Sequence, residues 1–239
     1  MPTTAGPNVI EDGLIFVVDP ANQRSYPGSG TTTNSLVANI SGTLENSPQF
    51  ELSNGGIFDF DGADDCINFG EDLFSILTSN FTLSFWAKHS GGATLKDFMA
   101  FTFGNSSVFY NCFILNFNTE SIEFFINNSK RFQLQFPTDA DLTNFTIDWN
   151  HYDIVYTPGT TGTCKVYINN SSTNFGNGSV IVNFSSAPTP NTTSGNPLKI
   201  GNPSPYSSGC KMGPIQIYNR ALSAAEVAQN YNALKDRFS

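Results

Sequence analysis

Short segments in which apolar and polar residues alternate recur along most of this 239-residue chain. In one of them Phe81, Leu83 and Phe85 alternate with threonine and serine. Successive side chains of a β-strand point to opposite faces, so each such segment can bury one face in a sheet. About a dozen of these segments, separated by Gly, Pro, Asn and Asp, predict an all-β fold, a two-sheet antiparallel jelly-roll sandwich.

Two pairs of these segments lie close enough together in the sequence to form hairpins. The first pair is residues 122–126 and 132–136, and the second pair is residues 152–156 and 164–168. Residues 24–34 contain the run Tyr-Pro-Gly-Ser-Gly, which predicts an irregular loop instead of a strand.

A strand followed by a capped helix is predicted at the end of the chain. Residues 212–218 are largely apolar, and Ser223 then stands three residues before Glu226, which is the spacing of a capping box. Leu222 and Val227 flank this box at the positions of a hydrophobic staple. We therefore expect a short amphipathic helix that packs on an apolar surface, and no helical period precedes it.

The first ten residues predict an extended arm, because they are rich in Pro, Thr and Gly and lack a periodic pattern. Residues 11–239 then form one jelly-roll domain, since a β-domain of this length is ordinary. An arm of this composition is ordered when an assembly holds it. The expected assembly contacts are Met1, Pro2, Thr3, Thr4 and Pro7.

The charge balance limits the possible partners. The chain has 11 Lys and Arg against 20 Asp and Glu, a formal net charge of -9 and a pI of about 4.5. A phosphate backbone would be repelled at long range, so we expect no nucleic-acid partner. The sequence also has no apolar run long enough for membrane insertion and no secretory signal, which predicts synthesis in a cytoplasm.

The four cysteines are Cys66, Cys112, Cys164 and Cys210, spaced 46, 52 and 46 residues apart. The absence of a closely spaced pair argues against a zinc site. Three disulfide pairings are possible, but buried thiols are the favoured reading for a chain made in a cytoplasm.

Four aspartates, Asp59, Asp61, Asp64 and Asp65, are candidate ligands for a metal ion. Their carboxylates are hard oxygen donors of the kind that Ca²⁺ prefers. The alternative is an ordinary Asp-Gly turn, whose side chains cap the backbone and bind nothing. The turn is the favoured reading, so we expect no cofactor, and Ca²⁺ is the one ion that these side chains could hold.

Carbohydrate binding needs an exposed aromatic plane beside polar side chains, because the apolar face of a sugar stacks on the ring while its hydroxyls form hydrogen bonds. Trp86 is the best candidate, and Tyr26 and Tyr206 in their loops come next. The alternative is that Trp86 and Trp149 are buried framework residues, as large aromatics usually are.

A catalytic site finds little support in the sequence. Glycosidases place two carboxylates on either side of the scissile bond, and alternate positions of one strand can supply them. The chain has no such run, and neither His89 nor His151 is accompanied by a nucleophile motif. We therefore predict that the chain is not an enzyme.

Five segments, in this order, resemble the successive motifs of the laminin-G-like, concanavalin A-like jelly-roll family: 81–86 (FTLSFW), 149–156 (WNHYDIVY), 165–169 (KVYIN), 198–201 (LKIG) and 217–223 (IYNRALS). Four others are similar to the form of this domain in structural proteins of tailed bacteriophages: 13–19 (GLIFVVD), 25–31 (SYPGSGT), 60–65 (FDGADD) and 224–234 (AAEVAQNYNAL). One departure is Gly213-Pro214, where the family usually has an acidic pair.

The resemblance implies a binding or structural role more often than catalysis. We therefore expect a bacteriophage virion structural protein on the exterior of the capsid or tail, made in the host cytoplasm, with decoration, stabilisation or surface adhesion as its task. Its expected partners are other virion proteins and further copies of itself in a homo-oligomer. The alternative is a lectin-like module that recognises host glycans.

Overall fold

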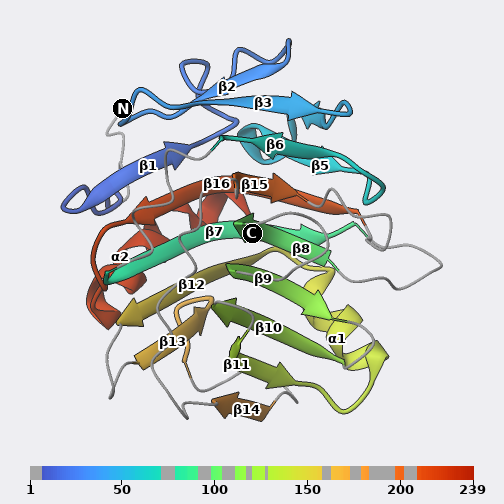
Figure 1. Cartoon of the computed structure of the whole chain (residues 1–239), viewed down its shortest axis with the longest axis vertical. Coiled ribbons are helices and arrows are strands. Elements are labelled where there is room, and N and C mark those ends of the chain that lie inside the picture. The colour runs from blue at the N-terminus through green and yellow to red at the C-terminus, as the bar shows by residue number, and fades with distance from the viewer. Residues whose placement is uncertain are drawn as a thin grey trace.

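The computed structural model describes residues 7–70, 79–90, 98–103, 111–116, 120–126, 129–157, 163–172, 179–182, 197–201 and 209–239. In this part of the chain the strands form two antiparallel sheets, as the alternating pattern predicts. Figure 1 shows β2 and β3 at one end of the stack of strands and β14 at the other.

The first sheet has the strand order β13-β12-β7-β16-β5-β4, and β1 also pairs with β16. The pairing of β12 with β13 confirms the second predicted hairpin. The strands of this first sheet are β1 (Leu14–Val18), β4 (Gln49–Glu51), β5 (Ile57–Phe60), β7 (Phe81–His89), β12 (Asn150–Thr157), β13 (Thr163–Ile168) and β16 (Cys210–Tyr218).

The second sheet has the strand order β14-β11-β10-β9-β8-β15-β6-β3-β2. The pairing of β10 with β11 confirms the first predicted hairpin. The strands of this second sheet are β2 (Thr32–Asn34), β3 (Ser41–Glu45), β6 (Cys66–Asn68), β8 (Phe98–Phe103), β9 (Asn111–Asn116), β10 (Ser121–Ile126), β11 (Ser129–Gln135), β14 (Ser179–Val182) and β15 (Leu198–Gly201).

The main core combines apolar residues from both sheets. Phe85 and Tyr152 come from neighbouring strands of the first sheet and stack with their ring centroids 5.3 Å apart. Ile122 and Leu134 come from the second sheet and are fully buried in the same cluster. Burial of each such side chain stabilises the fold by about 2 kcal/mol, so this layer is what holds the sandwich together.

The central strand β16 contains Pro214, although proline cannot donate a hydrogen bond to a neighbouring strand. The register with β7 shifts between Met212 and Ile215, so the proline sits in a bulge. A Cβ on the adjacent Gly213 would lie 2.5 Å from Cζ of Phe238. The Gly-Pro pair therefore interrupts the pairing and gives the aromatic ring near the C-terminus room to approach the strand.

The predicted C-terminal helix is confirmed as α2 (Ala224–Leu234), which begins with the full capping box. The Ser223 side chain accepts a hydrogen bond from the Glu226 N–H, and the Glu226 carboxylate accepts one from the Ser223 N–H. Leu222 and Val227 share one buried cluster, as a hydrophobic staple requires. A 3₁₀ turn, η4 (Lys235–Arg237), follows the helix.

Two expectations about local structure were wrong. A second helix, α1 (Asp139–Thr146), precedes α2, and Thr138 caps it by accepting from the Asp141 N–H. Its apolar period is weak because the helix is short, so the capping residues are the usable signal. The loop expected at 24–34 ends in β2, and a 3₁₀ turn, η1 (Ser53–Gly55), follows β4.

Three cysteines have described side chains, and all three are free, buried thiols: Cys66, Cys164 and Cys210. This agrees with the favoured reading of buried thiols. Burial raises the pKa of the Cys66 thiol to about 12, so that thiol stays protonated at neutral pH.

Candidate functional site

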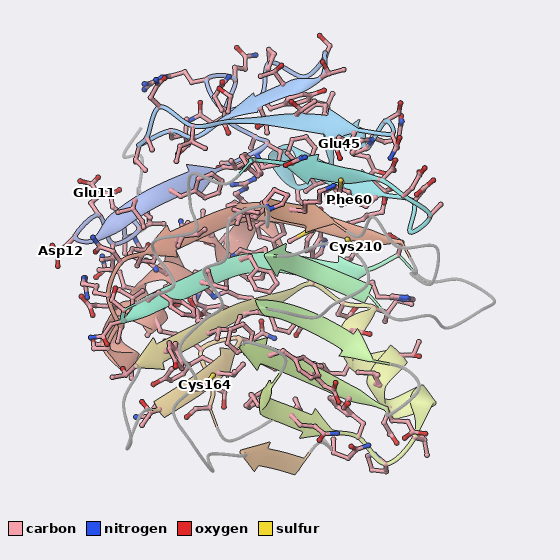
Figure 2. The ribbon with its side chains drawn as sticks, viewed as in Figure 1. Glu11, Asp12, Glu45, Phe60, Cys164 and Cys210 are labelled. Atoms are coloured by element: carbon pink, nitrogen blue, oxygen red, sulfur yellow. The ribbon has the colours of Figure 1, made fainter. Side chains whose placement is uncertain are left out.

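Residues 61–65, which we call the acidic loop, connect β5 of the first sheet to β6 of the second. The loop leaves β5 at Phe60, which Figure 2 shows close to Cys210 on the neighbouring strand. Asp61 Oδ1 accepts a hydrogen bond from the Ala63 N–H at 2.7 Å. Asp65 Oδ2 accepts from the Asp61 N–H at 3.1 Å. The backbone-capping turn considered as an alternative is therefore present.

The same loop also gathers negative charge. One carboxylate oxygen from each of Asp61, Asp64 and Asp65 lies within 4.8 Å of the others. Asp61 and Asp64 are exposed, whereas Asp65 is only 3% exposed, and its Oδ1 has no hydrogen-bond partner. Burial, followed by the charges of the neighbouring aspartates, raises the pKa of Asp65 above its ordinary value.

Asp59, the fourth predicted metal ligand, does not belong to this group. Its carboxylate Oδ2 lies 3.1 Å from Nζ of Lys211, which also pairs with Glu51. Its Oδ1 accepts a hydrogen bond from Ser90 Oγ at 3.3 Å. Of the four predicted metal ligands the structure thus brings three together, because Asp59 is the last but one residue of β5 and pairs with a lysine on β16.

The ends of two further strands lie against the acidic loop. A Cβ on Gly201, at the end of β15, would approach the Phe60 ring to 2.5 Å and the Asp65 carbonyl oxygen to 3.0 Å. A Cβ on Gly209, just before β16, would lie 2.8 Å from the Phe60 carbonyl oxygen. Glycine therefore permits the close approach that closes this end of the sandwich.

A second group of polar side chains lies on the outer face of the first sheet, beneath α2. Ser84 Oγ lies 3.0 Å from Nε2 of His151, and Nδ1 of His151 lies 3.1 Å from Oδ2 of Asp153. The second contact is at ion-pair distance but lacks the alignment of a hydrogen bond. We call Ser84, His151 and Asp153 the buried polar layer. The order of contacts is that of a hydrolytic triad, yet all three residues are buried, so no substrate reaches the serine in this conformation.

Motif reasoning missed the buried polar layer, because no sequence motif links a serine on β7 to a histidine on β12. The available signal was the pairing of the strands. His151 and Asp153 are two residues apart on one strand and share a face, and Asp153 is directly opposite Ser84 on the neighbouring strand.

Trp86 lies beside the buried polar layer and is 3% exposed. Its ring stacks on Phe238, with centroids 4.5 Å apart, and on Tyr231 of α2, with centroids 5.7 Å apart. The C-terminal segment therefore covers the ring, and Trp86 offers no exposed platform to a sugar. The carbohydrate-binding prediction at this residue is corrected, and the framework alternative holds for it.

Tyr26 is likewise buried, against Phe50 and Phe58. Its hydroxyl donates a hydrogen bond to the Gly30 carbonyl at 2.9 Å, which fixes the loop before β2. A tyrosine enclosed in this way does not stack on a sugar, so this prediction is also corrected. Tyr206, the third candidate, lies outside the described residues.

The predicted assembly arm is described only in part. Met1, Pro2, Thr3 and Thr4 lie outside the described residues, and Pro7 is exposed. The segment that follows is attached to α2. The Ile10 N–H donates to Asn230 Oδ1 at 2.8 Å, and Gln229 Nε2 donates to the Asn8 carbonyl at 2.8 Å. The start of the described chain and the C-terminal helix therefore form one unit.

No helix in the described ranges has the length and apolar character needed to cross a membrane.

Comparison with known proteins identifies a family. Residues 61–228, more than two thirds of the chain, match the sequence model described as the concanavalin A-like lectin/glucanases superfamily. No match was found among curated protein sequences.

Several solved structures share the fold. A Trypanosoma rangeli sialidase matches with a TM-score of 0.65 and 12% identity, over 100% of this chain and 36% of the sialidase chain. The binding domain of botulinum neurotoxin DC in complex with SialylT matches with a TM-score of 0.66 and 13% identity, over 93% of this chain and 52% of that one. The receptor binding domain of the botulinum neurotoxin C/D mosaic serotype matches with a TM-score of 0.64 and 16% identity, over 93% and 51%. This chain thus spans between about a third and a half of these proteins.

The sialidase match contradicts the prediction that this chain is not an enzyme. The sialidase is an enzyme and part of its chain has this fold, so the fold and the lack of a carboxylate-rich strand motif do not exclude catalysis. At 12% identity the likeness to the sialidase shows the fold alone.

Proposed function

Because this chain belongs to the concanavalin A-like lectin/glucanases superfamily, we propose that it is a bacteriophage virion structural protein on the exterior of the capsid or tail. In this role the sandwich decorates or stabilises the particle, or helps it adhere to a surface. The nine segments that resemble laminin-G-like and phage domains, from residue 13 to residue 234, support the proposal. The proposed partners are other virion proteins and further copies of the chain.

The burial of Trp86 is the observation that favours the structural role over sugar recognition. Every tryptophan and tyrosine whose side chain the structure describes is buried or half-buried: Trp86, Trp149, Tyr26, Tyr152, Tyr156, Tyr167, Tyr218 and Tyr231. Stacking on an exposed ring is the common basis of sugar binding. The chain instead carries a formal net charge of -9, which suits a protein that stays soluble at high copy number.

The test uses particles of the phage whose genome encodes this chain. We expect mass spectrometry of density-purified particles to find the chain in many copies, and antibodies against it to label intact particles. A chain that stays in the lysate supernatant and is absent from purified particles would contradict the proposal. Antibodies against an internal particle protein serve as the control for particle integrity.

Glycan binding is the second candidate. The neurotoxin binding domain in complex with SialylT supports it, because that domain shares the fold with a TM-score of 0.66. A glycan array probed with the native chain, with the heat-unfolded chain as control, tests this candidate. Selective binding by the native chain would favour a lectin role, and binding to no glycan would remove it.

A further inference from the structure

We propose that the side chains of Lys199 and Asn68 join in an isopeptide bond, and that Glu45 carries the protons for this reaction. The three residues lie on neighbouring strands of the second sheet, β15, β6 and β3. The inference does not depend on the proposed virion role, because it concerns only the chemistry of these side chains. Its product is a covalent link between two strands of the folded chain.

The strand pairing brings the amine and the amide together. Lys199 is directly opposite Asn68 in the antiparallel pair of β15 and β6. Side chains at directly opposite positions share one face of the sheet, with their Cβ atoms about 5 Å apart. The long side chain of lysine can therefore reach the amide of Asn68, although the two residues are far apart in the sequence.

Glu45, marked in Figure 2, contacts both reacting groups. Its Oε2 lies 3.2 Å from Nζ of Lys199, and its Oε1 accepts a hydrogen bond from Nδ2 of Asn68 at 2.9 Å. Burial raises the pKa of Glu45, but the hydrogen bonds from Asn68, Cys66 and Lys199 together lower that pKa below its ordinary value. Glu45 is thus a carboxylate at neutral pH, placed to take a proton from the amine and to give one to the amide nitrogen.

The carbonyl group of Asn68 is polarised by a separate contact. Its Oδ1 accepts a hydrogen bond from the Gly70 N–H at 3.0 Å. An N–H in this position stabilises the negative charge that develops on the oxygen when an amine attacks the carbonyl carbon. The orientation of the amide is also fixed, because Oδ1 faces a donor and Nδ2 faces an acceptor.

The reaction needs no further reactant. The ammonium group of Lys199 gives a proton to Glu45, and Nζ then attacks Cγ of Asn68. The Nζ–Cγ bond forms, the Cγ–Nδ2 bond breaks, and Nδ2 leaves as ammonia with the proton that Glu45 returns. Nζ loses a second proton, which the ammonia takes up. One amide bond and one ammonium ion are therefore the products.

A second lysine cluster offers a matched control. Lys211 also contacts two carboxylates, those of Glu51 and Asp59. The hydrogen bonds to these carboxylates in the described part of the chain come from Lys211, Ser53 and Ser90, and none comes from an amide side chain. Lys211 therefore has the ion pairs of Lys199 without an amide carbonyl to attack.

The experiment is intact-mass measurement and tryptic peptide mapping of the denatured full chain after incubation at pH 7. We expect a mass lower than that of the sequence by one ammonia molecule, and a branched peptide that joins residues 68 and 199. Glu45→Gln keeps the size of the side chain but cannot accept the proton, so bond formation should slow at least about a hundredfold. Lys211→Arg should form the bond as the native chain does.

Lys199→Arg separates a covalent link from an ion pair that only stabilises the sheet. Arginine keeps the positive charge beside Glu45 but stays protonated, so it cannot attack the amide. This variant should melt about 10 °C below the native chain, because a covalent link between distant residues restricts the unfolded state.

A native chain with the full mass of the sequence would overturn the proposal. Loss of ammonia without the branched peptide would do so too, because ring closure within Asn68 alone produces that mass. A Lys199→Arg variant that melts with the native chain would also contradict the covalent link.

Discussion

Asp65 and Asp153 are both buried carboxylates, but they lie in contrasting surroundings. Asp153 faces His151 at 3.1 Å under the cover of α2, whereas Asp65 faces other carboxylates in a loop at the edge of the sandwich. Among the described residues both carboxylates have an oxygen without a hydrogen-bond partner. They differ in their neighbours, because Asp153 lies beside an imidazole whereas Asp65 lies beside groups of its own charge.

This difference separates a buried polar layer from a loop whose carboxylates repel one another. A buried charge needs a partner of opposite charge or a hydrogen-bond donor. Where the partner is internal and sealed, as at Asp153, the residue stabilises one arrangement of the sheet and helix. Where the neighbours carry the same charge, as at Asp65, they oppose ionisation of the residue. The two regions should therefore respond in opposite ways to substitution.

The largest expected effect on stability comes from the aromatic stack of Trp86, Tyr231 and Phe238, which lies beside the buried polar layer. Trp86→Ala removes the ring that stacks on Phe238 and Tyr231, and it should lower the free energy of unfolding by about 4 kcal/mol. Urea denaturation followed by far-UV circular dichroism measures this loss. Trp86→Phe keeps a stacking ring and should lose clearly less. A Trp86→Ala variant as stable as the native chain would mean that the aromatic stack does not hold the helix.

The next effect is within the buried polar layer itself. Asp153→Ala leaves His151 buried beside an empty space, and we expect a loss of about 3 kcal/mol. Ser84→Ala removes only the hydroxyl that lies beside Nε2 of His151 and should cost less, about 1 kcal/mol. Urea denaturation of both variants checks this order. A cost that is equal for the two variants would contradict the role assigned to Asp153.

The smallest effect concerns the start of α2. Arg220 and then Ser223 lower the pKa of Glu226 to about 2, below its ordinary value of 4.5. A lowered carboxyl pKa stabilises the fold above the ordinary value, and this contribution is lost as the pH falls from 4.5 to about 2. Glu226→Ala should therefore cost about 1 kcal/mol at pH 7 and almost nothing at pH 2.

Urea denaturation at several pH values compares the native chain with Glu226→Ala. The exposed Asn232→Ala, elsewhere on α2, serves as the control and should show no trend with pH. A cost of Glu226→Ala that does not change with pH would show that the capping box acts without the charge.

Sequence patterns predicted the parts of this fold that depend on local chemistry. Alternation located the hairpins β10–β11 and β12–β13, and the Ser223–Glu226 spacing located α2. Alternation could not say that the polar face of β7 is buried, because α2 covers it from more than a hundred residues away in the sequence. Alternation alone therefore left Trp86 as a candidate platform for a sugar, although the structure buries it.

The candidate sites divide in the same way. The acidic loop was visible in the sequence because its aspartates are close together in the chain. The sequence did not show which aspartates lie together, because Asp59 pairs with Lys211, a residue of the neighbouring strand β16 that is far away in the sequence. The contact between Ser84 and His151 spans 67 residues, so only the strand pairing could reveal it.

The contrast between the two carboxylates can be measured directly by thermal unfolding of Asp65→Asn and Asp153→Asn beside the native chain at pH 7. Asp65→Asn should melt about 3 °C above the native chain, because repulsion in the acidic loop is relieved. Asp153→Asn should melt below the native chain, because the close contact with His151 is lost. If both variants melt below the native chain, the distinction between a repulsive loop and a buried polar layer is wrong.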